Sequence, residues 1–226
     1  MIIDMRTYTH KPSRYRQFLK LYQESGYAIT SKYLGFHVGL FTTSSDTVNR
    51  TVQWFAYDDH DHRDQCRRNF LNSATKQAFS NGDEGADGCI RTQESRVLIP
   101  TSFSPLQDRD PNNPILKAED CSRRMFEFNT YYCRPGHLAQ ALEVVEHKLY
   151  PAAQKHAHWI LAYLTGDAGP ERVYELRAYA TLQERMEANA AMRADADYVS
   201  AYSSLCEHLR DTDSVILEPM PMSAIQ

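Results

Sequence analysis

The alternation of apolar and polar positions near the start of the chain recurs in its second half. Residues 2–9 alternate as a half-buried strand does, and residues 126–131 repeat that pattern with Glu127 in the place of Asp4 (127 − 4 = 123). An apolar stripe at helical spacing follows the first segment, in Tyr15, Phe18, Leu19 and Tyr22. The same offset gives a second apolar stripe, in Leu138, Ala141, Leu142 and Val145. The paired patterns predict an internal repeat that contains a strand, a turn and a helix.

Further elements extend this repeat. We predict a first helix over about residues 13–26 that ends at Gly26, a strand over 33–42, a strand over 50–57 and a last strand over 95–99. The second half offers strands at 173–179 and 214–217, and Thr181 with Glu184 forms a capping-box pattern before a helix. Each half therefore reads β-α-β-β-α-β, the order of the ferredoxin-like unit. We predict an α+β fold of two tandem ferredoxin-like repeats, packed sheet to sheet as in a dimeric α/β barrel.

The predicted boundaries follow the loss of periodicity. Residues 101–124 hold Pro105, Pro111 and Pro114 and show no regular pattern. We expect a first domain over residues 1–107, a linker over 108–124 and a second domain over 125–226.

Composition narrows the class of protein. The net charge is −4 and 24% of the residues are charged, so nothing indicates a nucleic acid or an anionic membrane as partner. No apolar run approaches the roughly 20 residues of a membrane span, and a strand that begins at Ile2 leaves no room for a leader. The five cysteines are scattered without a CxxC pair, as in a reduced cytoplasmic protein. We expect a cytoplasmic protein that forms a homo-oligomer.

The polar positions of the first strand are candidates for a ligand pocket. Since Ile3 and Met5 suit a face covered by helices, we expect Asp4, Arg6 and Tyr8 to face the open side of the sheet. The second repeat contributes Glu127, Asn129 and Tyr131 at the matching positions. Arg6 could bind a carboxylate or an enolate-like oxygen, and Tyr8 and Tyr131 could donate to a carbonyl. The alternative is that Arg6 forms a structural ion pair with Asp4 or Glu94.

Histidines supply the second set of candidates. His37 stands mid-strand, on one face with Gly35, Gly39 and Phe41 if the strand is regular, and could act as a general base or be a core histidine. His156 and His158 lie two residues apart and could ligate a metal or haem on an extended segment. No carboxylate or third histidine stands at a standard spacing, so no metal site is predicted. His60 and His62 fit the solvated start of a helix.

The catalytic candidates are therefore Arg6, Tyr8 and His37. The ligand-binding candidates are Asp4, Gln53, Phe55, Tyr57, Arg96, Asn129, Tyr131, His158, Glu175 and Tyr179.

Several stretches resemble the NIPSNAP family. The opening residues 5–12, the segment 52–57 and the segment 93–100 with 103–106 carry the resemblance, and the second repeat fits it more loosely. The resemblance implies the dimeric α/β-barrel fold, whose members include cofactor-independent monooxygenases, isomerases, dehydratases and haem-binding proteins. The chain departs from the pattern where Arg6 is replaced by Asn129 in the second repeat, and where residues 82–88 form a Gly- and Asp-rich loop.

Three hypotheses for function follow. The first is an enzyme that acts on a hydrophobic or aromatic metabolite without an organic cofactor, by oxygenation, isomerisation or dehydration. The second is a scaffold or adaptor whose barrel interior is filled by side chains. The third is a haem-binding protein that uses His37 or His158.

Overall fold

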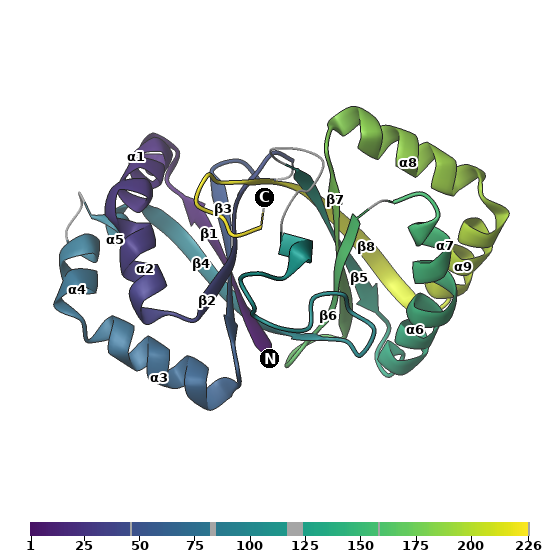
Figure 1. The fold of residues 1–226 in the computed structure, drawn as a ribbon, viewed down its shortest axis with the longest axis horizontal. Helices are drawn as coiled ribbons and strands as arrows, with labels where there is room; N and C mark the ends of the chain where they lie inside the picture. The colour runs from purple at the N-terminus through teal and green to yellow at the C-terminus, as the bar shows by residue number, and fades with distance from the viewer. Residues whose placement is uncertain (46, 82–84, 117–123, 158, 226) are drawn as a thin grey trace. The chain divides into compact units, whose positions relative to one another are not determined.

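The computed structural model describes all residues except 46, 82–84, 117–123, 158 and 226. The chain forms two compact units (Figure 1). Unit 1 holds residues 1–97, 108–117 and 219–225, and unit 2 holds residues 98–107 and 118–218. Each unit thus includes the end of the last strand of the other repeat and the short segment that follows it. The predicted domain boundaries at residues 107 and 125 stay a prediction.

Unit 1 has the predicted β-α-β-β-α-β order. Its strands are β1 (Ile2–His10), β2 (Phe36–Thr43), β3 (Arg50–Tyr57) and β4 (Ile90–Pro100), and its sheet order is β4-β1-β3-β2. Helices cover one face of this sheet (Figure 1): η1 (Pro12–Arg14), α1 (Tyr15–Leu21), η2 (Tyr22–Gly26), α2 (Tyr27–Tyr33), α3 (His60–Leu71), α4 (Ala74–Ser80) and α5 (Ala86–Cys89). A short turn, η3 (Pro114–Leu116), also belongs to unit 1.

Unit 2 repeats the same arrangement. Its strands are β5 (Met125–Cys133), β6 (Trp159–Gly166), β7 (Arg172–Tyr179) and β8 (Leu209–Pro219), in the order β8-β5-β7-β6. Its helices are α6 (Leu138–Val144), η4 (Val145–Leu149), α7 (Tyr150–Gln154), α8 (Leu182–Ala194) and α9 (Ala196–Cys206). The predicted capping box begins α8: the Glu184 amide donates to Thr181 Oγ1 at 3.1 Å, and the Ala180 amide donates to the Glu184 carboxylate at 2.6 Å.

The first helix of unit 1 does not end at Gly26, which corrects the prediction. Gly26 has helical backbone angles (φ −59°, ψ −43°) and closes a π-helical turn that continues into α2. A Cβ at this position would lie 2.7 Å from the Phe79 ring. The glycine therefore serves the packing of α4 against this helix and does not terminate it.

The predicted alternation of the second strand is also wrong. Residue 33 ends α2, and β2 contains a bulge between His37 and Gly39. Directly paired residues of antiparallel strands point to the same face, and His37 pairs with Phe55 while Leu40 pairs with Gln53. The extra residue thus puts His37 on the face of Leu40 and not on the face of Phe41.

Short segments extend the β2 and β6 edges of the two sheets. In unit 1 the Met220 amide donates to the Leu40 carbonyl at 2.8 Å, and the Ile225 amide donates to the Val38 carbonyl at 3.0 Å. In unit 2 the Thr101 amide donates to the Tyr163 carbonyl at 3.0 Å. Among the residues that the structure describes, no helix combines the length and the apolar character that a membrane crossing requires.

Candidate functional site

The polar residues of β1 face the helices and not the open side of the sheet. Arg6 and Tyr8 line a cavity together with side chains of α1, η2, α3 and α4. The expected orientation was wrong because both faces of β1 are buried: Ile3 is fully buried and Met5 is 6% exposed on the opposite face. Apolar residues in this strand therefore do not mark the side that the helices cover.

This cavity of unit 1 has a volume of about 320 Å³. The sheet contributes polar groups, and the helices contribute both apolar and polar side chains. The polar groups of the sheet are Arg6, Tyr8, Gln53 and Gln93. The apolar part of the lining holds Phe18, Leu34, Phe70, Leu71, Phe79 and Ile90, and the helices add the polar residues Tyr22, Thr30, Arg67, Lys76, Ser80 and Asp87. A cavity with apolar walls and convergent polar groups is the usual form of a small-molecule site.

Asp4 holds three arginines beside this cavity. Its carboxylate is fully buried, accepts from Arg6 Nε at 3.1 Å and Arg63 Nε at 3.0 Å, and lies 3.7 Å from a terminal nitrogen of Arg67. Ser95 Oγ donates to its other oxygen at 2.5 Å. Arg63 also pairs with Asp64 at 3.3 Å, so three arginines against two carboxylates leave a surplus of one positive charge. Two of these cations, Arg6 and Arg67, line the cavity. The ion pair of Arg6 with Asp4, left open by the sequence, is therefore present.

The electrostatics of Arg6 and Tyr8 are coupled. Burial alone would lower the pKa of Arg6, but the neighbouring Tyr8 and Asp4 outweigh it, and the pKa is raised. Burial raises the pKa of the Tyr8 hydroxyl, against the opposing effect of Arg6. Arg6 donates from a terminal nitrogen to Tyr8 Oη at 3.4 Å. The pair thus presents a permanent cation and a neutral hydroxyl to the cavity.

The remaining predicted residues of unit 1 lie in different surroundings. Gln53 lines the cavity and accepts from Tyr22 Oη at 3.5 Å. Phe55 and Tyr57 share the helix-covered face with Gln53 but are fully buried and do not line the cavity. Arg96 lies on β4 with a side chain 39% exposed, paired with Glu94 at 3.4 Å, and the structure does not bring it to the cavity.

His37 lies on the same face but in a second cavity of unit 1. This cavity has a volume of about 410 Å³ and shares Leu34 with the first. Burial lowers the pKa of His37 to about 4, so its ring is neutral at pH 7. The three catalytic candidates are therefore not brought together: Arg6 and Tyr8 share one cavity, and His37 lines the other.

The sheet of unit 2 holds a buried acid in place of Gln53. Glu175 is fully buried and accepts from Asn129 at 3.1 Å, from Tyr131 Oη at 2.8 Å and from Tyr163 Oη at 2.5 Å. Arg177 forms an ion pair with Glu175, and its Nη2 lies 2.9 Å from Oε1, the oxygen that also accepts from Tyr163. Burial, with Glu175 as the second cause, raises the pKa of Tyr131 and of Tyr163 well above the usual range. All of these donors belong to residues of unit 2.

A cavity of about 590 Å³ adjoins this cluster in unit 2. Glu127, Asn129 and Tyr131 line it, whereas Glu175 and Tyr179 do not. Glu127 is held by Arg185 and accepts from Tyr179 Oη at 3.4 Å. His158 lies outside the described residues.

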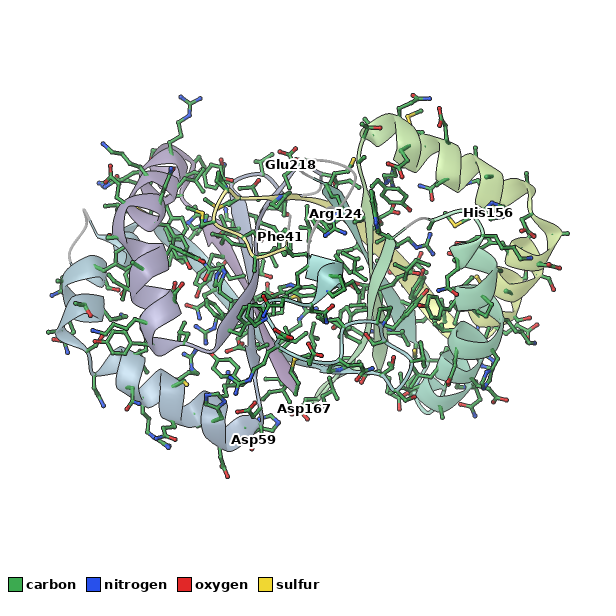
Figure 2. All side chains as sticks on the ribbon, in the orientation of Figure 1. Phe41, Asp59, Arg124, His156, Asp167 and Glu218 are labelled. Atoms are coloured by element: carbon green, nitrogen blue, oxygen red, sulfur yellow. The ribbon has the colours of Figure 1, made fainter. Side chains whose placement is uncertain are left out.

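His156, which the sequence paired with His158, has a structural partner. His156 Nε2 lies 2.7 Å from the Asp195 carboxylate, beside the start of α9 (Figure 2). Hydrogen bonding from His156 lowers the pKa of Asp195 to about 2. Within the described ranges, no group of three or more His, Cys, Asp or Glu side chains is placed to hold a metal ion.

Sequence reasoning missed two residues of these sites. Arg67 was not among the candidates, yet its spacing from Arg63 (i, i+4) and Phe70 (i, i+3) places all three on one face of α3. Arg177 lies at the position of Phe55 in the repeat, and an arginine two residues after Glu175, on the same face of the strand, was the available signal.

The sequence pattern of the NIPSNAP family matches residues 3–105 and 126–224. The chain belongs to the NIPSNAP family. A NIPSNAP domain protein from Burkholderia xenovorans shares 35% identity over 46% of this chain and 99% of its own length, with a TM-score of 0.43. None of the curated proteins matches the chain.

Two solved structures resemble the NIPSNAP chain over almost its whole length. A Fusobacterium nucleatum protein described as "Putative monooxygenase" matches with a TM-score of 0.63 and 10% identity, covering 96% of this chain and 91% of its own. An "anthrone oxidase-like protein" matches with a TM-score of 0.57 and 11% identity, covering 97% of this chain and 91% of its own. These similarities confirm the predicted fold class, tandem ferredoxin-like repeats of the dimeric α/β-barrel type.

Proposed function

We propose that the cavity between β1 and the helices of unit 1 binds a small aromatic or hydrophobic molecule that carries a negative charge on oxygen. The observation that supports this most directly is the surplus of one positive charge, with Arg6 and Arg67 both lining a cavity that has apolar walls. A carboxylate or enolate would accept from Arg6 and Arg67, while its ring would pack against Phe18 and Phe79. This pocket lies on the helix-covered face and differs from the barrel-interior pocket expected from the sequence.

The same groups would serve a reaction. A fixed cation and a neutral hydroxyl stabilise charge that develops on an oxygen, which isomerisation, dehydration and cofactor-independent oxygenation through an enolate have in common. The "Putative monooxygenase" and "anthrone oxidase-like" descriptions of the structural relatives are consistent with an aromatic substrate. A scaffold whose faces are completely filled would not need this cavity.

Binding is tested by calorimetry with 2-naphthoate and its neutral amide. We expect the carboxylate to bind at least about tenfold more tightly than the amide, since a hydrogen bond to a charged group contributes about 1.5–3 kcal/mol. Arg6→Asn, which copies Asn129 of the second repeat, should remove that preference. The matched control Arg96→Asn should retain it, because Arg96 lies on the exposed part of β4. Equal binding of acid and amide by the unmodified protein would contradict the proposal.

Two further expectations, a homo-oligomer and haem binding, remain predictions. A homo-oligomer is tested by light scattering of the purified protein. The haem hypothesis through His37 is tested by visible absorption after haem addition, where a Soret shift that His37→Ile removes would support it.

A further inference from the structure

The second cavity of unit 1 contains a buried polar group that the proposed function does not use. The walls of this cavity, which we call the His37 cavity, are Tyr27, Ser31, Leu34, Gly35, Phe36, His37, His62, Arg109 and Ala224. Tyr27, Ser31 and Leu34 follow one another along one face of α2 and its end, opposite β2. The cavity is thus enclosed by one helix, one strand and later segments of the same unit.

Neither ring nitrogen of His37 has a hydrogen-bond partner among the described residues. The residue is 5% exposed, and both ring nitrogens are buried. Its contacts are aromatic: the ring lies edge-on to Phe55 at 4.7 Å and to Tyr27 at 5.4 Å between centroids. Buried polar groups are nearly always satisfied in folded proteins, and one that is not satisfied destabilises the fold.

The matching position of unit 2 shows that the fold does not require a histidine here. Ile160 pairs with Arg177 in β7 as His37 pairs with Phe55 in β3, and both strands carry a bulge directly after this residue. The same backbone position therefore accepts an apolar side chain. The histidine in unit 1 needs a reason other than packing.

The charged groups at the cavity already neutralise one another. The Asp58 carboxylate accepts from Arg109 at 2.7 Å and lies 3.0 Å from His62 Nδ1. Asp58 itself does not line the cavity, and both members of its pair with Arg109 are partly exposed. The buried end of the cavity therefore offers a neutral imidazole and aromatic rings without a free charge.

We propose that the His37 cavity binds a phenol or a similar aryl alcohol, whose hydroxyl hydrogen-bonds to the His37 ring while its aromatic ring packs against Tyr27 and Phe36. A neutral imidazole has one acceptor and one donor nitrogen, and an un-ionised phenol matches the acceptor without adding a charge. Phenols have a pKa near 10 and stay neutral at pH 7. This site is separate from the anion site around Arg6, although Leu34 borders both.

The test uses the full chain with ¹⁵N-labelled histidines, titrated with phenol and with toluene. Toluene has nearly the same size but no hydroxyl. We expect a saturable shift of the His37 ring nitrogens with phenol, and about tenfold weaker binding of toluene, the effect of one hydrogen bond. The His37 signals are assigned by their loss in His37→Ile.

The variant His37→Ile provides the matched control, since it installs the residue of unit 2. It should bind phenol and toluene equally, melt at the same or a higher temperature and keep the binding of 2-naphthoate. Unchanged binding of 2-naphthoate separates this proposal from the proposed function. A second variant, His37→Gln, retains an acceptor and should keep part of the phenol preference.

Several outcomes would overturn the proposal. The first is a phenol titration that leaves the His37 signals unmoved, as expected if the ring binds only water. The second is equal affinity for phenol and toluene in the unmodified protein. The third is a His37→Ile variant that still prefers phenol.

Discussion

Unit 1 carries Arg6 and Gln53 as a directly opposed pair on β1 and β3, whereas unit 2 carries Asn129 and Glu175 at the matching positions. The charged member of the pair is thus a cation on the first strand of unit 1 and an anion on the third strand of unit 2. In unit 2 a further exchange places Arg177 where unit 1 has Phe55. The two repeats keep one backbone plan and distribute their buried charges differently over it.

The difference separates an acid surrounded by donors from an acid shared by several arginines. Glu175 receives three hydrogen bonds and an ion pair from its own unit. Asp4, by contrast, is shared by three arginines, of which Arg63 also pairs with Asp64. A buried acid with its hydrogen bonds made stabilises a fold, and a surplus of one positive charge beside a cavity is available to a ligand.

The largest effect is expected at the centre of unit 2. Glu175→Gln leaves the buried Arg177 without its counter-ion and should lower the free energy of unfolding by about 3–5 kcal/mol. Urea denaturation followed by circular dichroism measures this loss. Adding Arg177→Phe restores the Gln and Phe combination of unit 1 and should recover most of it. A double variant as unstable as the sum of the single variants would show that the two positions are independent.

The second effect compares the acids at the start of each repeat. Asp4→Asn removes the shared counter-ion of three arginines, of which Arg63 keeps its pair with Asp64. It should cost about 2–3 kcal/mol, less than a fully buried pair because Arg63 and Arg67 are partly exposed. Glu127 forms one ion pair among the described residues, with Arg185, and Glu127→Gln should cost less. Thermal unfolding at low salt ranks the two variants. If Glu127→Gln were the more damaging, the charge surplus assigned to unit 1 would be wrong.

The third effect concerns the π-helical turns that both units share. Gly26 closes one turn and the buried Leu149 closes the other, and Phe79 lies where a side chain on Gly26 would extend. Gly26→Leu should cost about 1–3 kcal/mol through overpacking. Combining it with Phe79→Ala should cost less than the sum of the two single changes, as measured by urea denaturation. Additive costs would mean that Phe79 does not occupy the place of Leu149.

The effect that is smallest at pH 7 is a pH dependence that only unit 1 contributes through these positions. Burial lowers the pKa of His10 and of His37 to about 4 from an ordinary 6.5, while Cys133 and Ile160 stand at the matching positions. Between about pH 6.5 and 4 the unfolded chain binds protons that the folded chain does not, so stability falls as the pH falls.

Each such histidine contributes a slope of up to about 1.4 kcal/mol per pH unit. His37→Ile should flatten the dependence over this window and leave the stability at pH 8 equal or higher. Denaturation series at several pH values test this, and an unchanged slope would show that His37 titrates normally in the folded protein.

The sequence predicted the strands better than the faces of those strands. The 123-residue offset located β1 and β5, and the β-branched and aromatic residues of 50–57 gave the bounds of β3 as the structure has them. The prediction of the strand faces was wrong because Ile3 and Met5 are buried on one side of β1 while Asp4 and Arg6 are buried on the other. Hydropathy distinguishes two faces only when one of them meets solvent.

The candidate site was predicted in part. Arg6, Tyr8 and Gln53 line one cavity, but the bulge after His37 could not be seen in the sequence, and it decides which side of β2 that ring occupies. Phe79 and Arg67 come from helices whose packing depends on tertiary contacts. Their roles as ligand-site residues stay proposals.

The segments that follow β4 and β8 have a consequence for how the protein could be divided. Residues 219–225 complete the sheet edge of the unit formed by the first repeat, and residues 98–107 do so for the unit formed by the second. A chain cut within residues 108–124 would therefore yield two fragments, each holding a piece that the other needs. The halves of this protein should behave as a complementing pair of fragments rather than as two independent proteins.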